Sequence, residues 1–155
     1  MTDQSNDLSH ITPKGSVSQR YESQHKVLRE MIAEVRGTLE SQSDSLDILG
    51  SQLSVLAQKL QEHFLEEEEG GFFDHIRKRA PQLSTNSTQL EKEHVDLLGQ
   101  IRDLIAKAAT CEGSEPWWQG LKTDFHDFSK LLTQHESLEN QLLQRAYSED
   151  IGFHD

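Results

Sequence analysis

The chain has 155 residues, of which 34% are hydrophobic and 27% charged, so it is long enough to bury the core of one domain and is not disordered throughout. No apolar run approaches the roughly 18 residues of a membrane span, and the excess of 27 acidic over 15 basic residues disfavours a nucleic-acid partner. A single cysteine, Cys111, and the absence of an apolar secretion signal in Met1–Pro13 predict a soluble, cytoplasmic protein.

Four segments place apolar residues at alternating steps of three and four, the pattern of a helix with one buried stripe. They follow a polar, turn-rich tail over residues 1–16, and a short C-terminal tail is expected over 148–155. The expected helices cover about residues 17–40, 45–69, 82–110 and 114–147, and residues 72–81 are expected to form an extra helical turn and a loop. The connections are short and no strand pattern competes, so we predict an all-α, up-down-up-down antiparallel four-helix bundle over residues 17–147.

Each predicted stripe contains one histidine at a position that would ordinarily hold a leucine. These residues are His25, His63, His94 and His135. Counted from the connecting turns at about 1.5 Å per residue, histidines on neighbouring helices lie level to within about one helical turn. A single histidine on such a stripe is usually a hydrogen-bonded core residue, but independent core histidines have no reason to be level. The four imidazoles are therefore expected to meet in one layer, as a metal site requires.

Two of these helices add a carboxylate to the same layer. His63 is followed by Glu67 and His135 by Glu139, and a separation of four residues puts both side chains on one helix face. Four imidazoles and two carboxylates in an apolar core are unfavourable unless cations compensate them. Two divalent metals would do so, and imidazole with carboxylate suits iron, manganese or zinc, of which we prefer iron.

The other acidic and histidine residues are predicted to lie outside this ligand set. Glu66, Glu68 and Glu69 are expected on a solvated face, since only Glu67 of that run lies on the buried stripe. The remaining histidines, which fall off the stripes or in the tails, are His10, His75, His126 and His154.

Taken together, the four spaced elements resemble the hemerythrin-like HHE cation-binding domains over about residues 17–147. The matching residues are His25, His63 to Glu67, Glu93-His94, and His135 to Glu139. The resemblance implies a non-haem di-iron centre with a bridging oxo or hydroxo group, in which His25 and His63 bind one iron and His94 and His135 the other. It implies that Glu67 and Glu139 bridge the irons. It also implies binding of dioxygen, or of nitric oxide or peroxide, for sensing, storage or stress response, with an enzymatic role left open.

The sequence departs from the oxygen carriers of this family in two places. Those carriers have a second histidine on the third helix, where this chain has Leu90, and an aspartate five residues after the last histidine, where it has Glu139 at four. On two octahedral irons with about twelve positions, about two then stay open, unless Tyr21, Glu66 or Glu93 serves as a further ligand or supports one. The ligand pocket is expected to be lined by Leu28, Leu56, Leu60, Leu90, Leu97 and Leu132.

Two alternatives use the same helices. A ferritin-like, carboxylate-rich di-iron oxidase or iron-handling protein would use Glu22 and Glu91, each three residues before a histidine. A metal-free helical interaction module would recruit a basic partner and could expose Trp117 and Trp118 as an apolar patch, although one of them is more readily placed as a cap on the core. The sequence leaves the oligomeric state open, with a monomer slightly favoured.

Overall fold

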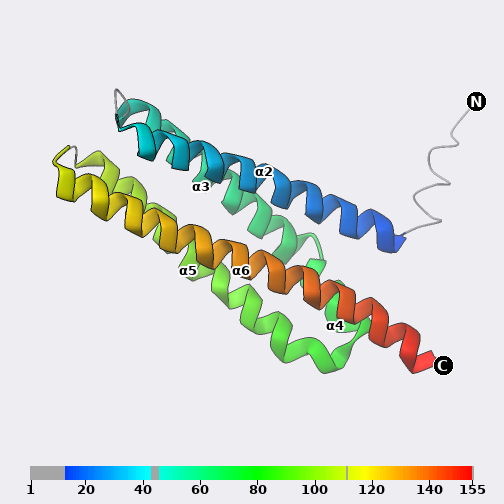
Figure 1. Ribbon diagram of the computed structural model, residues 1–155. Helices are drawn as coiled ribbons and strands as arrows, with labels where there is room; N and C mark the ends of the chain where they lie inside the picture. The colour runs from blue at the N-terminus through cyan, green and yellow to red at the C-terminus, as the bar shows by residue number, and fades with distance from the viewer. Residues whose placement is uncertain (1–12, 43–45, 111, 155) are drawn as a thin grey trace, which may run out of the picture.

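The structure is a computed structural model that describes the backbone of residues 13–42, 46–110 and 112–154, and the side chains of residues 19–42, 46–110 and 112–148. Every regular element within these ranges is helical, which confirms the all-α prediction (Figure 1). The elements in chain order are α2 (Pro13–Ser41), α3 (Leu46–Glu69), α4 (Phe72–Arg79), a 3₁₀ turn (Pro81–Leu83), α5 (Ser84–Ala109) and α6 (Glu115–His154).

The two outer helix ends extend further than the apolar pattern predicted. α2 begins at Pro13 rather than Val17, and proline is favoured in the first turn because its missing N–H has no helical acceptor there. α6 continues past Tyr147 to His154, since residues 148–151 contain neither glycine nor proline to end it. The division into a bundle and two tails therefore stays a prediction, and His10 lies outside the described residues, as does the side chain of His154.

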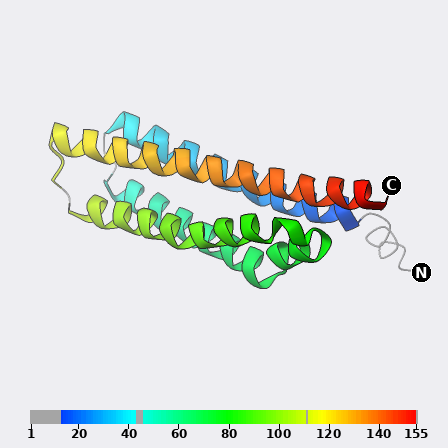
Figure 2. The ribbon, with the colours of Figure 1, turned by 90° about the horizontal axis from the view of Figure 1, so that it is seen from below.

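The four long helices pack as a closed ring. α2 contacts α3 and α6, and α5 contacts the same two helices from the other side. The first residues of α2 and the last of α6 lie at the same end of the molecule, and α4 packs at that end against α3, α5 and α6 (Figures 1 and 2). The core is thereby enclosed along its length by four amphipathic helices.

Two groups of buried apolar side chains fill this ring, one on each side of the histidine positions. The larger group runs from Leu28 and Phe64 to the α5–α6 connection and includes Trp117 and Trp118. The smaller group lies around α4, with Tyr21 and Phe73 among its members. The histidine layer is consequently sealed from both ends by apolar side chains.

Trp117 and Trp118 close the far end of the larger group rather than forming an exposed patch. Both are buried, and their rings meet edge to face at 5.0 Å. The Trp117 indole N–H donates to Thr110 Oγ1 at 3.0 Å, while its backbone N–H donates to Ser114 Oγ at 3.3 Å and so caps the start of α6. These contacts oppose the interaction-module alternative, which could expose the tryptophans as an apolar patch.

The sharp turn after α3 depends on Gly70 and Gly71. Gly71 has φ +97°, a backbone conformation that favours glycine, and the Gly70 N–H donates to the Glu66 carbonyl at 2.7 Å. A Cβ on Gly70 would lie 2.3 Å from that carbonyl oxygen. The turn folds α4 back against the bundle, so that Phe72 and Phe73 enter the core beside the histidine layer.

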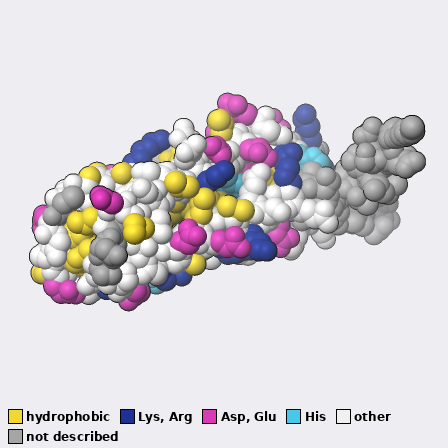
Figure 3. All heavy atoms as spheres, turned by 90° about the horizontal axis from the view of Figure 1, so that it is seen from above, with side chains coloured by type: hydrophobic (Ala, Val, Ile, Leu, Met, Phe, Trp, Pro, Cys, Tyr) yellow, Lys and Arg dark blue, Asp and Glu magenta, His cyan; other side chains and the backbone are white. Residues whose placement is uncertain are grey.

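The surface mixes charges of both signs. On the face seen in Figure 3, acidic side chains lie among Lys and Arg side chains and small apolar areas, without a continuous basic patch. Among the described helices, none combines the length and the apolar composition needed to cross a lipid bilayer.

Candidate metal centre

The structure brings together the four imidazoles that the sequence placed at one level. His25 comes from α2, His63 from α3, His94 from α5 and His135 from α6, and all four are buried. The ring centroids of His25 and His63 are 4.9 Å apart, and those of His94 and His135 are 5.0 Å apart. The four rings thus form two neighbouring pairs inside the core.

The carboxylates of Glu67 and Glu139 lie between the two pairs and are fully buried. Glu67 places Oε2 3.1 Å from His63 Nε2 and Oε1 3.1 Å from His94 Nε2. Glu139 places Oε1 3.3 Å from His25 Nε2 and Oε2 2.8 Å from His135 Nε2. Each carboxylate therefore directs one oxygen toward each pair of histidines.

These six residues make two overlapping groups with the spacing of metal ligands. One group contains His25 and His63, the other contains His94 and His135, and both include Glu67 and Glu139. Within each group the candidate ligand atoms lie within 4.8 Å of one another. The arrangement provides imidazole nitrogens and carboxylate oxygens for two cations that share both carboxylates.

Several of these ligand atoms are buried without a hydrogen-bond partner among the described residues. They are His25 Nδ1 and Nε2, His63 Nε2, His135 Nε2, both carboxylate oxygens of Glu67, and Glu139 Oε1. Buried polar atoms are nearly always paired, because leaving one unsatisfied is unfavourable by about 1–3 kcal/mol. The donor set is of the kind that iron, manganese and zinc take, so the residues fit a pair of divalent metals.

Burial and mutual contact drive the two carboxyl pKa values apart. Burial raises the pKa of Glu67, but its close contacts with the His63 and His94 imidazoles, each at 3.1 Å, outweigh burial and hold that pKa well below its usual range. Burial, followed by the charge of Glu67, raises the pKa of Glu139 well above 4.5. The two carboxyl groups therefore titrate as a coupled pair, in which the charge of one opposes ionisation of the other.

Burial also keeps candidate imidazole ligands in the neutral form that binds metals. Desolvation, with a smaller contribution from His63, lowers the pKa of His25 to about 4. Desolvation also lowers the pKa of His135. At neutral pH these two rings consequently retain a free lone pair.

Three of the four imidazoles are oriented by a hydrogen bond from Nδ1, which turns Nε2 toward the carboxylates. His63 Nδ1 donates to Gln24 Oε1 at 2.5 Å. His94 Nδ1 donates to Glu68 Oε2 at 2.6 Å, and His135 Nδ1 donates to Glu93 Oε1 at 2.8 Å. Such contacts fix the tautomer of a metal-binding histidine and raise its basicity.

Glu68 lies on the exposed face, as predicted, but its contact with a ligand histidine was not predicted. Its partly exposed side chain reaches across to α5 and accepts from His94. Gln24 was not predicted at all, although its position directly before His25 matches that of Glu93 before His94. The signal available in the sequence was this shared position of polar residues beside the predicted ligands.

The other two residues considered as further ligands, or as support for one, lie beside His63 without contributing to the two ligand groups. The Tyr21 hydroxyl accepts from Arg20 at 2.8 Å, while its ring packs edge-on against Phe72 at 4.6 Å. Glu66 pairs with Arg20 at 3.1 Å and accepts from Gln24 Nε2 at 2.8 Å. Neither residue belongs to the two ligand groups.

Apolar side chains surround the layer. The six leucines predicted to line the pocket are all buried, five in the larger apolar group and Leu90 in the smaller one. Two phenylalanines that were not predicted also contact the histidines: Phe64 stacks on His94 with centroids 3.8 Å apart, and the Phe73 ring lies 5.6 Å from the same imidazole. These side chains limit the access of water to the carboxylates.

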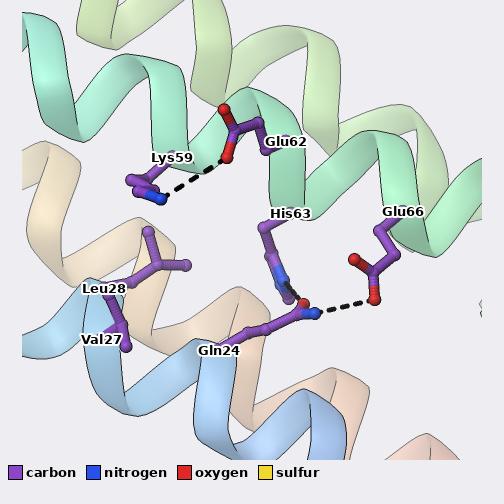
Figure 4. Close-up of a pocket in the computed structure, with 7 residues that line it drawn as sticks. All are labelled: Gln24, Val27, Leu28, Lys59, Glu62, His63 and Glu66. Carbon is purple, nitrogen blue, oxygen red and sulfur yellow. Dashed lines mark hydrogen bonds and ion pairs between the residues drawn. The ribbon is translucent and has the colours of Figure 1, made fainter.

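A pocket of about 190 Å³ opens between α2 and α3 beside His63 (Figure 4). In Figure 4 the Gln24 amide lies between His63 and Glu66, and the Lys59–Glu62 ion pair lies farther along α3. Leu28 forms part of the apolar wall. The pocket brings solvent near the outer edge of His63 without exposing its Nε2.

Residues outside the predicted set do not join the layer. His126 is exposed, and His75 Nε2 lies 2.6 Å from the Tyr147 hydroxyl. The carboxylates needed by the ferritin-like alternative are also elsewhere, since Glu22 is exposed and Glu91 pairs with Arg77 at 2.6 Å. The geometry therefore favours the histidine-rich set.

Glu136 is a further buried carboxyl that was not anticipated. Burial raises its pKa to about 8, although the charge of Arg29 acts in the opposite direction. Burial therefore favours the neutral form of this carboxyl.

Comparison with known proteins identifies one related family. A family model described as the hemerythrin HHE cation binding domain matches residues 16–147, a range that contains all six residues of the two groups. No curated protein and no solved structure matches the chain.

Proposed function

Because this chain belongs to the hemerythrin HHE cation-binding domain family, we propose that it is a non-haem di-iron protein that binds dioxygen, nitric oxide or peroxide within its helical bundle. The observation that carries the proposal is the pair of overlapping ligand groups that share two buried carboxylates. Two cations would neutralise these carboxylates and occupy lone pairs that the protein leaves unpaired.

In this proposal His25 and His63 would hold one iron and His94 and His135 the other, and the carboxylates of Glu67 and Glu139 would be available to both. When bound, iron supplies reversible one-electron redox chemistry and open coordination positions for a small ligand. The surrounding leucines and Phe64 keep water from the layer, which would slow oxidation by air. The hydrogen bonds to Nδ1 hold the imidazoles in the orientation that binding requires.

The biological role we propose is sensing, storage or a stress response to such a ligand, in the cytoplasm. We also propose that the four long helices follow the up-down-up-down order, which their neighbour relations support. We propose a monomer without nucleic-acid or membrane partners, in keeping with the net charge of −12.

Elemental analysis of protein purified without added metal tests the proposal. We expect about two irons per chain and near-ultraviolet absorption that changes when dioxygen or azide is added to the reduced protein. Metal-free protein whose stability is unaffected by added iron would contradict the proposal and support an interaction module.

The ferritin-like alternative is separated by replacing Glu22 and Glu91 with glutamine. Because these side chains lie outside the two ligand groups, iron content and the visible spectrum should stay as in the wild type. Loss of one iron in the double variant would instead support the carboxylate-rich site.

A further inference from the structure

The two halves of the candidate centre correspond residue by residue. Gln24-His25 on α2 corresponds to Glu93-His94 on α5, because each pair places a polar residue directly before a histidine. The stretch from His63 to Glu68 on α3 corresponds to the stretch from His135 to Asn140 on α6. In each stretch a glutamate of the ligand groups follows the histidine by four residues, and a polar residue comes directly after that glutamate.

The correspondence extends to contacts across the helices. Gln24 on α2 accepts from His63, and its counterpart Glu93 on α5 accepts from His135. Glu68 on α3 accepts from His94, whereas the counterpart position on α6 is occupied by Asn140, an exposed neutral amide. His25 Nδ1 itself has no hydrogen-bond partner among the described residues.

The chemical character of these Nδ1 partners differs between the two halves. Both imidazoles of the His94–His135 pair donate to a carboxylate. In the His25–His63 pair, His63 donates to a neutral amide and His25 to nothing. The Gln24 amide is held in the accepting orientation because its Nε2 donates to Glu66, which is paired with Arg20.

A carboxylate on Nδ1 strengthens a metal site in two ways. It makes the imidazole a better electron-pair donor through Nε2, and it adds negative charge close to the cation; losing such a partner typically lowers metal affinity about 10–100-fold. Because Glu67 and Glu139 are shared by both groups, they do not create a difference between them. The difference comes from Glu68 and Glu93.

We propose that the two metal positions are unequal, and that Glu68 and Glu93 act as positioning residues which make the His94–His135 position bind a divalent cation first and more tightly than the His25–His63 position. The inference rests on the proposed two-metal function. It predicts a stable species with one metal at His94–His135 before the second position fills.

Titration of metal-free protein with Co²⁺, followed by visible absorption and calorimetry at constant pH, tests this order. The wild type should show two binding steps with dissociation constants at least about tenfold apart. His25→Ala should retain the tight step, whereas His94→Ala should retain only a weak one. Two steps of equal affinity would overturn the inference, although the two-metal function would stand.

Substitutions of the residues that accept from Nδ1 test whether their charge, rather than a contribution to the fold, sets the metal affinity. Glu68→Gln with Glu93→Gln should weaken the first step about 10–100-fold and leave the second nearly unchanged, so that the steps merge. Gln24→Glu should act in the opposite direction and tighten the second step, a gain that a merely structural role would not give. Glu69→Gln, in the same acidic run but exposed, is the matched control and should bind as the wild type.

The outcomes distinguish the inference from the function on which it rests. The role of Glu68 and Glu93 would be overturned if the Glu68→Gln/Glu93→Gln and Gln24→Glu variants bound metal as the wild type does. Circular dichroism would show that these variants are folded. Failure of the wild type to bind any Co²⁺ would remove the two-metal function, and the inference with it.

Discussion

At the scale of single residues, the centre depends on side chains that are unfavourable in the core on their own. Glu67 and Glu139 have pKa values shifted in opposite directions, and His25 has its pKa lowered to about 4 by burial. Such groups oppose folding unless a cation compensates them. Substitutions in the layer should therefore affect metal content and stability together.

His135→Ala should lower iron from about two per chain to one or fewer. It should also reduce the free energy of unfolding of the loaded protein by about 3 kcal/mol, because Glu139 loses a partner while remaining buried. Elemental analysis and denaturant unfolding measure the two effects. His126→Ala, which removes an exposed histidine from the same helix, is the control and should retain both irons.

Leu28→Ser should accelerate oxidation of the reduced protein by air several-fold. Leu28 is buried and forms part of the wall of the pocket beside His63, so a smaller polar side chain would admit water toward the layer. Stopped-flow absorption after mixing with air-saturated buffer gives the rate. Leu131→Ser changes a leucine of α6 that is 44% exposed, and equal acceleration in that variant would contradict the explanation.

At the scale of elements, the turn after α3 positions both Glu67 and the phenylalanines of α4. Gly70 and Gly71 make this turn possible, whereas a Cβ added to Gly37, Gly50 or Gly99 inside the long helices would meet no atom within 4 Å. The contact of α4 with α6 adds a titratable pair, His75 and Tyr147, beside Arg79. Substitutions in the turn after α3 or in the contact between α4 and α6 should therefore change the stability of the fold and leave the two ligand groups intact.

Gly71→Ala should lower the free energy of unfolding by about 1 kcal/mol or more, because its φ of +97° is strained for alanine although no atom lies within 4 Å of the added Cβ. Gly50→Ala is the matched control inside α3, where an added Cβ also meets nothing within 4 Å. There alanine should raise stability by about 0.5–1 kcal/mol. Denaturant unfolding measures both free energies, and a change in the same direction in both variants would contradict this account.

The contact between α4 and α6 should weaken in acid. Burial, followed by the charge of Arg79, lowers the pKa of His75 below 6.5. The unfolded chain therefore binds this proton at higher pH than the folded one, and the stability that depends on neutral His75 is lost as pH falls through 6.5.

The measurement is the free energy of unfolding of wild type and His75→Gln between pH 7.5 and 5.5. The wild type should lose more stability on acidification, by less than about 1 kcal/mol because the imidazole is partly exposed. Identical slopes would exclude a contribution from His75.

At the scale of the whole molecule, metal binding and folding are coupled, because the ligands come from all four long helices. A cation at the centre links α2, α3, α5 and α6 at one level of the bundle. Its removal leaves unpaired polar atoms in the core. The stability of the bundle as a whole should thus report on metal occupancy.

Removal of both metals by a chelator should lower the thermal midpoint by roughly 10–20 °C. Saturation at about one hundred times the dissociation constant contributes about 2.7 kcal/mol per site, and one kcal/mol shifts the midpoint of a chain of this size by about 2–4 °C. Scanning calorimetry before and after dialysis against chelator, with iron restored as the control, measures the change. A midpoint that chelation leaves unaltered would mean that no metal contributes to folding.

The sequence by itself determined the four helices and the common level of their histidines. Apolar residues repeat with the period of a helix, and the nearly constant rise per residue turns sequence position into height along the bundle. His25, His63, His94 and His135 could therefore be placed in one layer before any contact was known. The same periodicity directed Glu67 and Glu139 inward.

Only the tertiary structure decided which side chains support those ligands. Glu68 and Gln24 lie beside the buried stripe, where the pattern predicts solvent, and the close approach and rotation of the neighbouring helices bring them onto His94 and His63. The opposite pKa shifts of Glu67 and Glu139 likewise arise from contacts across the bundle. Periodicity gives the height and face of a residue on its own helix, whereas contacts across helices depend on how the helices pack against one another.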